Sequence, residues 1–191
     1  MKHITLSPLS KENVKLAGQI QYKIFPHSAS YSKYLEELED DNCEYRDFII
    51  TLGTIPIGII GYYLDSYEKD TAWLSWFGLL NENRHKGFGR DSLNLLCDIL
   101  KNKGFKRLRL FTYEVWNKEA QPFYQKYMDF EEYYTNENDN QYDIINGKCK
   151  IFTKNLSKEK SALWNNKFIN IGEEDTLNEQ SIIKMKMDKI I

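Results

Sequence analysis

The sequence is short of cysteine, of long apolar runs and of net charge, and each shortage excludes a class of protein. Its three cysteines are an odd number without CxxC spacing, which argues against a disulfide scaffold or a zinc ribbon and favours a reducing compartment. The first ten residues lack the apolar core of a signal peptide. The longest apolar run, residues 55–64, is far shorter than the ~20 residues of a membrane span. We therefore expect a cytoplasmic protein without a membrane partner.

The charges nearly cancel, with 26 Lys and Arg against 28 Asp and Glu. A net charge of -2 provides no general electrostatic attraction to nucleic acid or to an anionic membrane. Hydrophobic residues make up 41% of the chain and aromatic residues 14%, which is enough for a packed core. At ~150 residues per domain, the 191 residues predict one domain and a surplus of roughly forty residues.

Hydrophobic periodicity predicts strands that alternate with helices. The predicted strands are 4–6, 48–52, 57–64, 72–80, 106–113, 130–135 and 148–153. The predicted helices follow Ser10 as far as Pro26, then cover 30–39, the segment after Gly89 to about Lys103, and 118–127. Strand–helix–strand crossovers imply parallel pairing and the hairpins imply antiparallel pairing, so the sheet should be mixed.

The most informative segment is the polar loop that joins the strand 72–80 to the following helix. It holds Gly87 and Gly89 together with basic residues, namely Arg84, His85, Lys86 and Arg90. The first turn of a helix carries unbonded N–H groups and partial positive charge, and glycines let a phosphate approach that backbone. A diphosphate-binding turn is one interpretation, and a helix start with a solvated basic face is the other. The Walker, dinucleotide, HExxH and GxSxG patterns are absent.

Two motifs resemble those of a known family. Arg84-x-x-Gly87-x-Gly89, five residues after Leu79, resembles the acetyl-CoA pyrophosphate loop of the GNAT superfamily of N-acetyltransferases. Downstream, Asn117-x-x-Ala120-x-x-Phe123-Tyr124 resembles the second signature of that family. The resemblance covers residues 1 to about 154 and departs in one place, where Asp129 stands for the family's glycine after one extra residue. Because aspartate tolerates a left-handed backbone, we expect that turn to survive.

The resemblance implies an α/β (α+β) fold of the GNAT type. Such a fold has three layers, with a mixed, mostly antiparallel central sheet flanked by helices, and here it would carry a C-terminal extension. It also implies acetyl-CoA as co-substrate and no metal. The residues expected to bind acetyl-CoA are Leu79, Arg84, His85, Lys86, Gly87, Phe88, Gly89, Arg90, Asn117 and Tyr124.

The resemblance assigns chemical roles to two of these residues. A backbone N–H near Leu79 would polarise the thioester carbonyl, and Gly78 would either permit a bulge there or allow close packing. Tyr124 would protonate the departing thiolate. The alternative is that Tyr124 only packs in the core. Asn117 would bond the pantetheine amide or simply begin a helix.

The sequence offers several candidates for the general base. Many relatives place a carboxylate on the central strand, but residues 72–80 contain none. Glu114, beside the end of the strand 106–113, is the first candidate, His27 and Glu36 are weaker ones, and a water relay is an alternative. The acidic run 36–41 could attract a cationic amine or could be a solvated helix end.

The surplus lies in the tail, so we expect a domain at 1–155 and an extension at 156–191. Ser157–Trp164 could form a short helix. Ile183, Met185 and Met187 alternate with charged residues as in a strand, although a helix from Glu173 also accommodates them. Its apolar content suggests that the extension docks on the domain or on a second subunit, which would make a homodimer.

Together these observations predict an enzyme that moves an acetyl group from acetyl-CoA to a primary amine of a small molecule or a peptide. The amine would attack directly. The alternative is a non-catalytic acyl-CoA-binding or protein-interaction module on the same fold.

Overall fold

The computed structural model describes residues 3–26, 28–65, 68–113, 115, 118–134, 149–164 and 174–191, with backbone only at 134 and 174–178. It divides into two compact units. Unit 1 comprises residues 1–64, 74–98 and 170–191, and unit 2 comprises 65–73 and 99–169. In the described part of the chain, no helix is long and apolar enough to cross a membrane.

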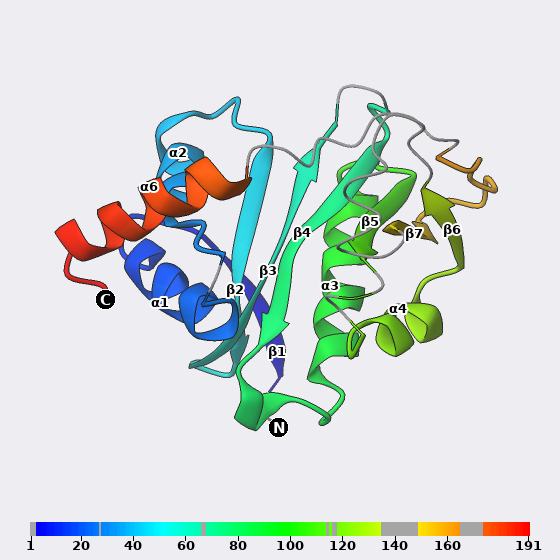
Figure 1. Ribbon diagram of the computed structural model, residues 1–191. Helices are drawn as coiled ribbons and strands as arrows, with labels where there is room; N and C mark the ends of the chain where they lie inside the picture. Colours follow the sequence, from blue (N-terminus) through cyan, green and yellow to red (C-terminus); the bar gives the residue numbers. More distant parts are fainter. Residues whose placement is uncertain are drawn as a thin grey trace. The chain divides into compact units, whose positions relative to one another are not determined.

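Unit 1 is a set of antiparallel strands covered by helices. Its elements are β1 (Ile4–Pro8), α1 (Val14–Ile24), α2 (Tyr31–Glu39), β2 (Tyr45–Leu52), β3 (Ile55–Leu64), the main part of β4 (Thr71–Leu79), the 3-10 turn η1 (Asn81–Asn83), most of α3 (Phe88–Asn102) and α6 (Glu174–Met187). Figure 1 shows α1, α2 and α6 gathered beside β2. Their apolar side chains meet the strands at Ile49 and Ile59 and form the core of this unit.

The tail takes part in that core through α6. Met185 is fully buried, the Tyr31 hydroxyl donates to Asp188 Oδ2 at 3.0 Å, and the Ser32 N–H donates to Ser181 Oγ at 3.1 Å. Of the two alternatives for residues 183–187, the helix is therefore correct and the strand is wrong. Within this helix Met185 is buried and Ile182 packs against the same core, whereas Ile183 and Met187 are exposed, so the two-residue spacing does not set the structure.

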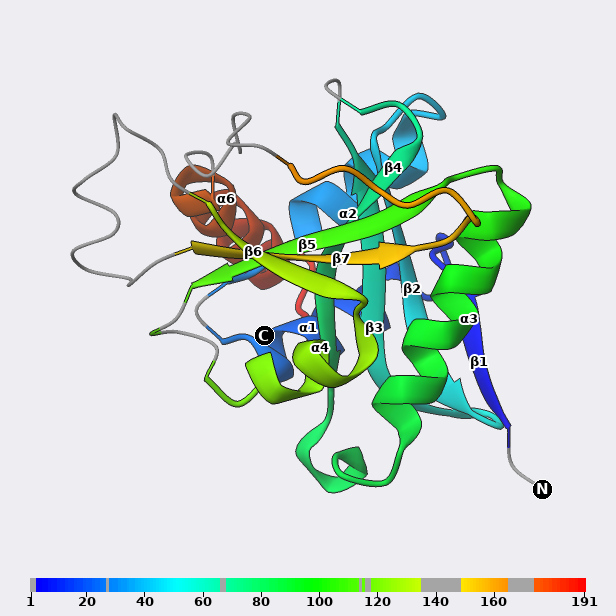
Figure 2. The ribbon, with the colours of Figure 1, turned by 90° about the vertical axis from the view of Figure 1, so that its right-hand side faces the viewer.

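Unit 2 holds the remaining strands, β5 (Arg107–Tyr113), β6 (Phe130–Tyr134) and β7 (Cys149–Asn155), together with α4 (Gln121–Tyr127). Figure 2 shows β7 between β5 and β6, and both pairings are antiparallel. The guanidinium of Arg109, although fully buried, is satisfied because it donates to Glu68 Oε2 at 3.0 Å and to Thr153 Oγ1 at 2.8 Å.

The segment that follows β7 is held by the same arginine. Arg109 Nη2 donates to the carbonyl oxygen of Ala162 at 2.8 Å, and the buried ring of Trp164 meets that of Trp73 edge-on at 4.8 Å. Residues 157–164 contain no helix, so the prediction of a short helix there is wrong. The segment is held by the hydrogen bond to the backbone of Ala162 and by the ring of Trp164, and these contacts do not require a helix.

The strands follow the hydrogen-bonded order β1-β2-β3-β4-β5-β7-β6 in a seven-stranded sheet. The β4–β5 pairing is parallel, whereas β1–β2, β2–β3, β5–β7 and β6–β7 are antiparallel. This arrangement confirms the predicted fold class, a mixed and mostly antiparallel sheet flanked by helices.

Candidate functional site

The polar loop after β4 is a tightly closed turn. The Leu80 N–H donates to the carbonyl oxygen of Ile57 at 2.9 Å, which keeps this end of β4 against β3. Arg84 Nε then donates to the carbonyl oxygen of Leu79 at 3.0 Å and closes a loop over η1. One nitrogen of Arg84 therefore fixes the shape of the turn, a role that the sequence motif did not specify.

The turn continues through two left-handed residues. His85 has φ 60° and Gly87 has φ 85°. A side chain at position 87 would be strained by this backbone, which accounts for the glycine of the motif. The space in front of Gly87 is open, because the nearest atom to an added Cβ would be Arg90 Nη2 at 3.8 Å. The turn thus leaves room for a ligand atom at close range to the backbone.

Helix α3 begins directly after this opening. The Asp91 N–H donates to the carbonyl oxygen of Gly87 at 3.2 Å, so the N–H groups of Phe88 and Gly89 precede the first bond of the helix. Lys86 is exposed beside them, and Arg90 forms an exposed ion pair with Asp91 at 2.8 Å. Unbonded N–H groups, the helix dipole and nearby basic side chains together suit a diphosphate.

The backbone N–H groups near the end of β4 point in alternating directions. Its parallel pairing with β5 runs over three residue pairs, from Thr71–Arg107 to Trp73–Arg109. Successive N–H groups of a strand point to opposite sides, and that of Leu80 faces β3. The N–H group of Leu79 therefore points away from β3, where it could meet a ligand that lies along the strand.

Gly78 packs closely against the end of α1. An added Cβ would lie 2.5 Å from Ile24 Cγ2 and 3.0 Å from Phe25 Cζ. Close packing is thus the role that the structure gives this glycine. The alternation of β4 breaks earlier, because the consecutive side chains of Ser75 and Trp76 both reach the side of the sheet that α1 and α2 cover. Such a break is typical of a β-bulge.

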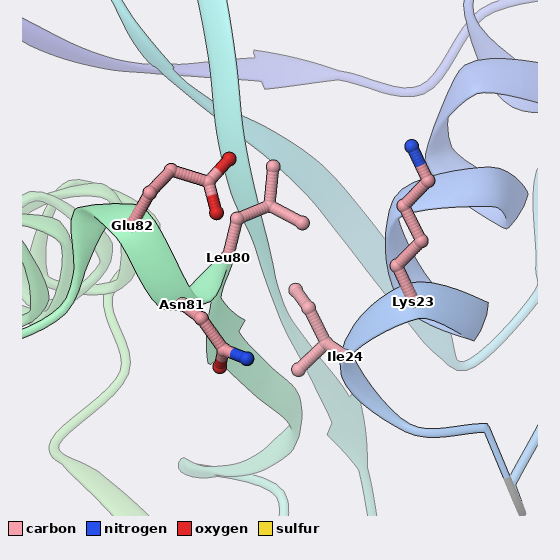
Figure 3. A pocket seen from close by; sticks show the side chains of 5 residues that line it. All are labelled: Lys23, Ile24, Leu80, Asn81 and Glu82. Atoms are coloured by element: carbon pink, nitrogen blue, oxygen red, sulfur yellow. The ribbon is translucent and has the colours of Figure 1, made fainter.

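A small pocket lies beside the same end of β4. It encloses about 220 Å³ and is lined by Lys23 and Ile24 of α1 and by residues 80–82. Figure 3 shows Lys23 and Glu82 on opposite sides of its apolar centre, which Ile24 and Leu80 form. Its lining offers one cation, one anion and an amide around a narrow apolar surface.

Tyr124, the predicted proton donor, lies in unit 2 on α4. Its ring is half-buried and packs against Phe152 of β7, with 5.6 Å between the ring centroids. Burial raises the pKa of Tyr124 well above its usual range, so the phenol keeps its proton at any ordinary pH. Ring contacts with Phe123 and Phe152 hold the side chain within unit 2.

Several predicted residues cannot be placed. Asn117, Glu114 and His27 lie outside the described residues. Asp129 is described, and it does not have the left-handed backbone that we expected in this turn. Its carboxylate accepts instead from the Asn155 N–H at 2.7 Å and from Lys154 Nζ at 2.9 Å. The turn therefore survives through side-chain hydrogen bonds to β7.

Sequence reasoning missed a group that we call the Asp47 cluster, consisting of the buried Tyr34 and Asp47 and the half-buried Glu37 and Ser75. Asp47 of β2 is 4% exposed, and its N–H donates to Glu37 Oε2 of α2 at 3.0 Å. Ser75 Oγ of β4 donates to Asp47 Oδ1 at 3.2 Å. Tyr34 is 1% exposed, and its hydroxyl has no hydrogen-bond partner among the residues that the structure describes. The cluster links α2, β2 and β4 through polar groups within unit 1.

The cluster exists because position 61 is a glycine. Gly61 of β3 pairs with Asp47 and separates β2 from β4. An added Cβ would overlap Asp47 Oδ1 and would lie 2.6 Å from Ser75 Oγ. The carboxylate of Asp47 therefore crosses β3 over a backbone without a side chain. A charged residue in β2 opposite a glycine was the available signal, but the predicted strand began at Phe48 and left Asp47 outside it.

Burial makes the two carboxyls unusually weak acids. It raises the pKa of Asp47 to about 8, with a further increase from the negative charge of Glu37. Burial also raises the pKa of Glu37 to about 7, against opposing effects from the Asp47 N–H and from Arg46. At neutral pH the cluster therefore holds at least one proton that a solvated carboxyl pair would release.

This difference predicts how stability depends on pH. Carboxyls of the unfolded chain titrate near pH ~4, so the folded state holds more protons between that value and about pH 8. The stabilising contribution is complete below the unfolded pKa and is lost as the pH rises through the folded values. The free energy of unfolding, measured by urea denaturation across this range, should fall with rising pH in the wild type.

The Asp47→Asn variant should show a smaller fall, because it removes one of the two groups. Glu39→Gln removes an exposed carboxylate from the same helix as Glu37 and should keep the slope of the wild type. Equal slopes for Asp47→Asn and the wild type would show that the raised pKa of Asp47 has no part in stability.

Comparisons with known proteins agree with this geometry. Among solved structures, an acetyltransferase from Thermus thermophilus is similar, with 18% identity, a TM-score of 0.61, and coverage of 81% of this chain and 99% of that one. The ribosomal-protein-S18-alanine N-acetyltransferase from Escherichia coli has 18% identity, a TM-score of 0.59, and coverage of 84% and 99%. A spermidine/spermine N-acetyltransferase from Vibrio cholerae has 19% identity, a TM-score of 0.60, and coverage of 82% and 94%.

Identities of this size show a shared fold. A search of curated proteins found no match. Residues 11–130 match the family described as "Acetyltransferase (GNAT) family". Because this match extends over more than half of the 191 residues, the chain belongs to the GNAT family of acetyltransferases.

Proposed function

We propose that the protein transfers an acetyl group from acetyl-CoA to a primary amine of a small molecule or a peptide, by direct attack of the amine. The observation that carries this proposal is the closed turn between β4 and α3 in a chain of the GNAT family. That turn combines an open approach to Gly87 with unbonded N–H groups at the start of a long helix.

The diphosphate of acetyl-CoA would lie against the N–H groups of Gly87, Phe88 and Gly89. Lys86 is exposed beside this backbone and would supply a positive charge to it. Arg84 would act mainly by holding the turn, since its Nε is bonded to Leu79. Arg90 would have to exchange its exposed bond with Asp91 for a phosphate oxygen, which costs little because exposed ion pairs are weak.

The thioester would lie along β4. The N–H group of Leu79 points away from β3 and could donate to the oxygen on which charge develops during attack. One such preorganised donor is commonly worth ~2.7–4 kcal/mol in the transition state. The strand itself would thus both bind the acyl arm and activate its carbonyl group.

Tyr124 would donate a proton to the thiolate that leaves. Support comes from its place in the second family motif, and burial, which raises the pKa of the phenol, leaves it protonated when the thioester binds. A protonated donor is required at the moment when the carbon–sulfur bond breaks. Asn117 would bond the pantetheine amide.

The structural neighbours suggest which acceptors to test first. One neighbour is named for spermidine and spermine, and another for the alanine of ribosomal protein S18. A panel for this chain should therefore contain a polyamine, a peptide with an N-terminal alanine and a simple alkylamine. Acetyl-CoA binding without turnover of any acceptor would favour the non-catalytic alternative.

The phosphate-binding turn can be tested with a charge placed in it. Gly87→Glu should weaken acetyl-CoA binding by at least about tenfold in calorimetry, because it sets a carboxylate where a phosphate would lie. Gly53→Glu is the matched control, since Gly53 is also exposed and left-handed (φ 64°) but lies in the β2–β3 turn. Equal affinities for the two variants would place the diphosphate elsewhere.

The proton donor can be tested by removing one hydroxyl. Tyr124→Phe should lower kcat by about 10²–10⁴-fold, the usual contribution of acid catalysis, and should leave acetyl-CoA affinity unchanged. Tyr127→Phe removes a hydroxyl from the same helix and should retain activity. The assay is release of free CoA thiol. A greater loss in Tyr127→Phe would assign the role to the other tyrosine.

A further inference from the structure

An amine that attacks a thioester must first lose a proton. Ammonium groups of the lysine type have pKa values near ~10, so most of the acceptor arrives protonated at neutral pH. Strand β4, along which the thioester would lie, has no carboxylate of its own. The proton must therefore pass to a group that another element brings to this strand.

The Asp47 cluster brings such a group to β4. The carboxylate of Asp47 crosses β3 over Gly61 and accepts a hydrogen bond from Ser75 Oγ at 3.2 Å. Ser75 precedes Phe77 by two residues in the strand, a separation of about 7 Å along the backbone. The carboxylate of Asp47, a residue of β2, thus ends at Ser75, on the strand along which the thioester would lie.

We propose that Asp47, acting through the hydroxyl of Ser75, accepts the proton that the acceptor amine releases before attack. The inference rests on the proposed acetyltransferase function. The ammonium transfers one proton to Ser75 Oγ, directly or through a bridging water, while Ser75 passes its own proton to Asp47 Oδ1. The nitrogen retains the electron pair of its broken N–H bond and uses it to attack the thioester carbon.

Exposure and bonding within the cluster suit this relay. Ser75 is half-exposed, whereas Asp47 is buried, so the hydroxyl is the accessible end of the pair. A hydroxyl can donate one hydrogen bond and accept another at the same time. Among the described residues, no ion pair neutralises Asp47 or Glu37, and the hydroxyl of Tyr34 has no partner. Asp47 therefore becomes a proton acceptor only as the pH approaches its raised pKa of about 8.

The surrounding charges adjust the basicity of Asp47. From α2 it faces Glu37, Tyr34 and Lys33, and Arg46 and Tyr62 interact with Glu37 from β2 and β3. Burial and the charge of Glu37 raise the pKa of Asp47 to about 8, whereas Ser75 and Lys33 oppose the rise. A base with a pKa near the working pH is effective, because it binds the proton and releases it again.

The test is the pH dependence of kcat/KM for the full chain with acetyl-CoA and the best amine of the panel. In the wild type, kcat/KM should rise with pH as Asp47 loses its proton, and we call this rise the acidic limb. Asp47→Asn keeps the size of the side chain, should lower kcat/KM by about 100-fold or more at neutral pH, and should abolish the acidic limb. Glu37→Gln should move that limb to lower pH by on the order of one unit, because it removes a like charge. Glu39→Gln, on the exposed face of α2, should leave the limb unchanged.

A second variant separates the relay from folding. Ser75→Ala keeps the carboxyl pair and should lower kcat, with the affinity for acetyl-CoA unchanged in calorimetry. An acidic limb in Asp47→Asn equal to that of the wild type would overturn the inference and leave the proposed function intact. If the wild type binds acetyl-CoA but acetylates no amine, the proposed function fails and this inference fails with it.

Discussion

The hydrogen bond from Arg84 to the carbonyl oxygen of Leu79 determines where β4 ends and how α3 begins. With that bond in place, the chain turns back through two left-handed residues and starts a helix whose first N–H groups remain unbonded. Both features that the proposed chemistry needs follow from it. The diphosphate has a positive helix end to bind, and the thioester has the backbone of β4 beside it.

Strand β4 also connects the binding turn to the buried acids of unit 1. Four residues before Leu79, Ser75 meets the carboxylate of Asp47, which reaches it only because Gly61 has no side chain. Burying the carboxyls costs stability, and the structure offsets part of that cost with hydrogen bonds from a serine hydroxyl and a backbone N–H and with the nearby charges of Lys33 and Arg46. Apolar residues of similar size often pack at least as stably as buried charged groups, so a role in proton transfer gives these acids a purpose that packing alone does not.

The elements that follow local patterns were predictable. The central sheet, the helices that flank it and the turn at Gly87 could all be read from periodicity and glycine placement. The Asp47 cluster could not, because it depends on the register between β2 and β3, which no local pattern specifies. The tail shows the same limit: Ile183, Met185 and Met187 have a strand-like spacing, but the segment is a helix in which Met185 is buried and the other two are exposed. At Asp129, two hydrogen bonds to β7 replaced the backbone conformation expected from residue type.

Direct transfer from acetyl-CoA to an amine is the central claim of this account. None of the cysteines is placed as an activated nucleophile: Cys97 and Cys149 are buried, and burial raises the pKa of the Cys43 thiol. The most direct measurement uses acetyl-CoA labelled with carbon-13 in the acetyl group, followed by NMR and by mass spectrometry of the intact protein. Without an amine, no label should reach the protein. With a suitable amine, the label should appear as an amide, and one CoA thiol should be released for each amide formed. Label on the protein, or no amide with any amine of the panel, would contradict the account.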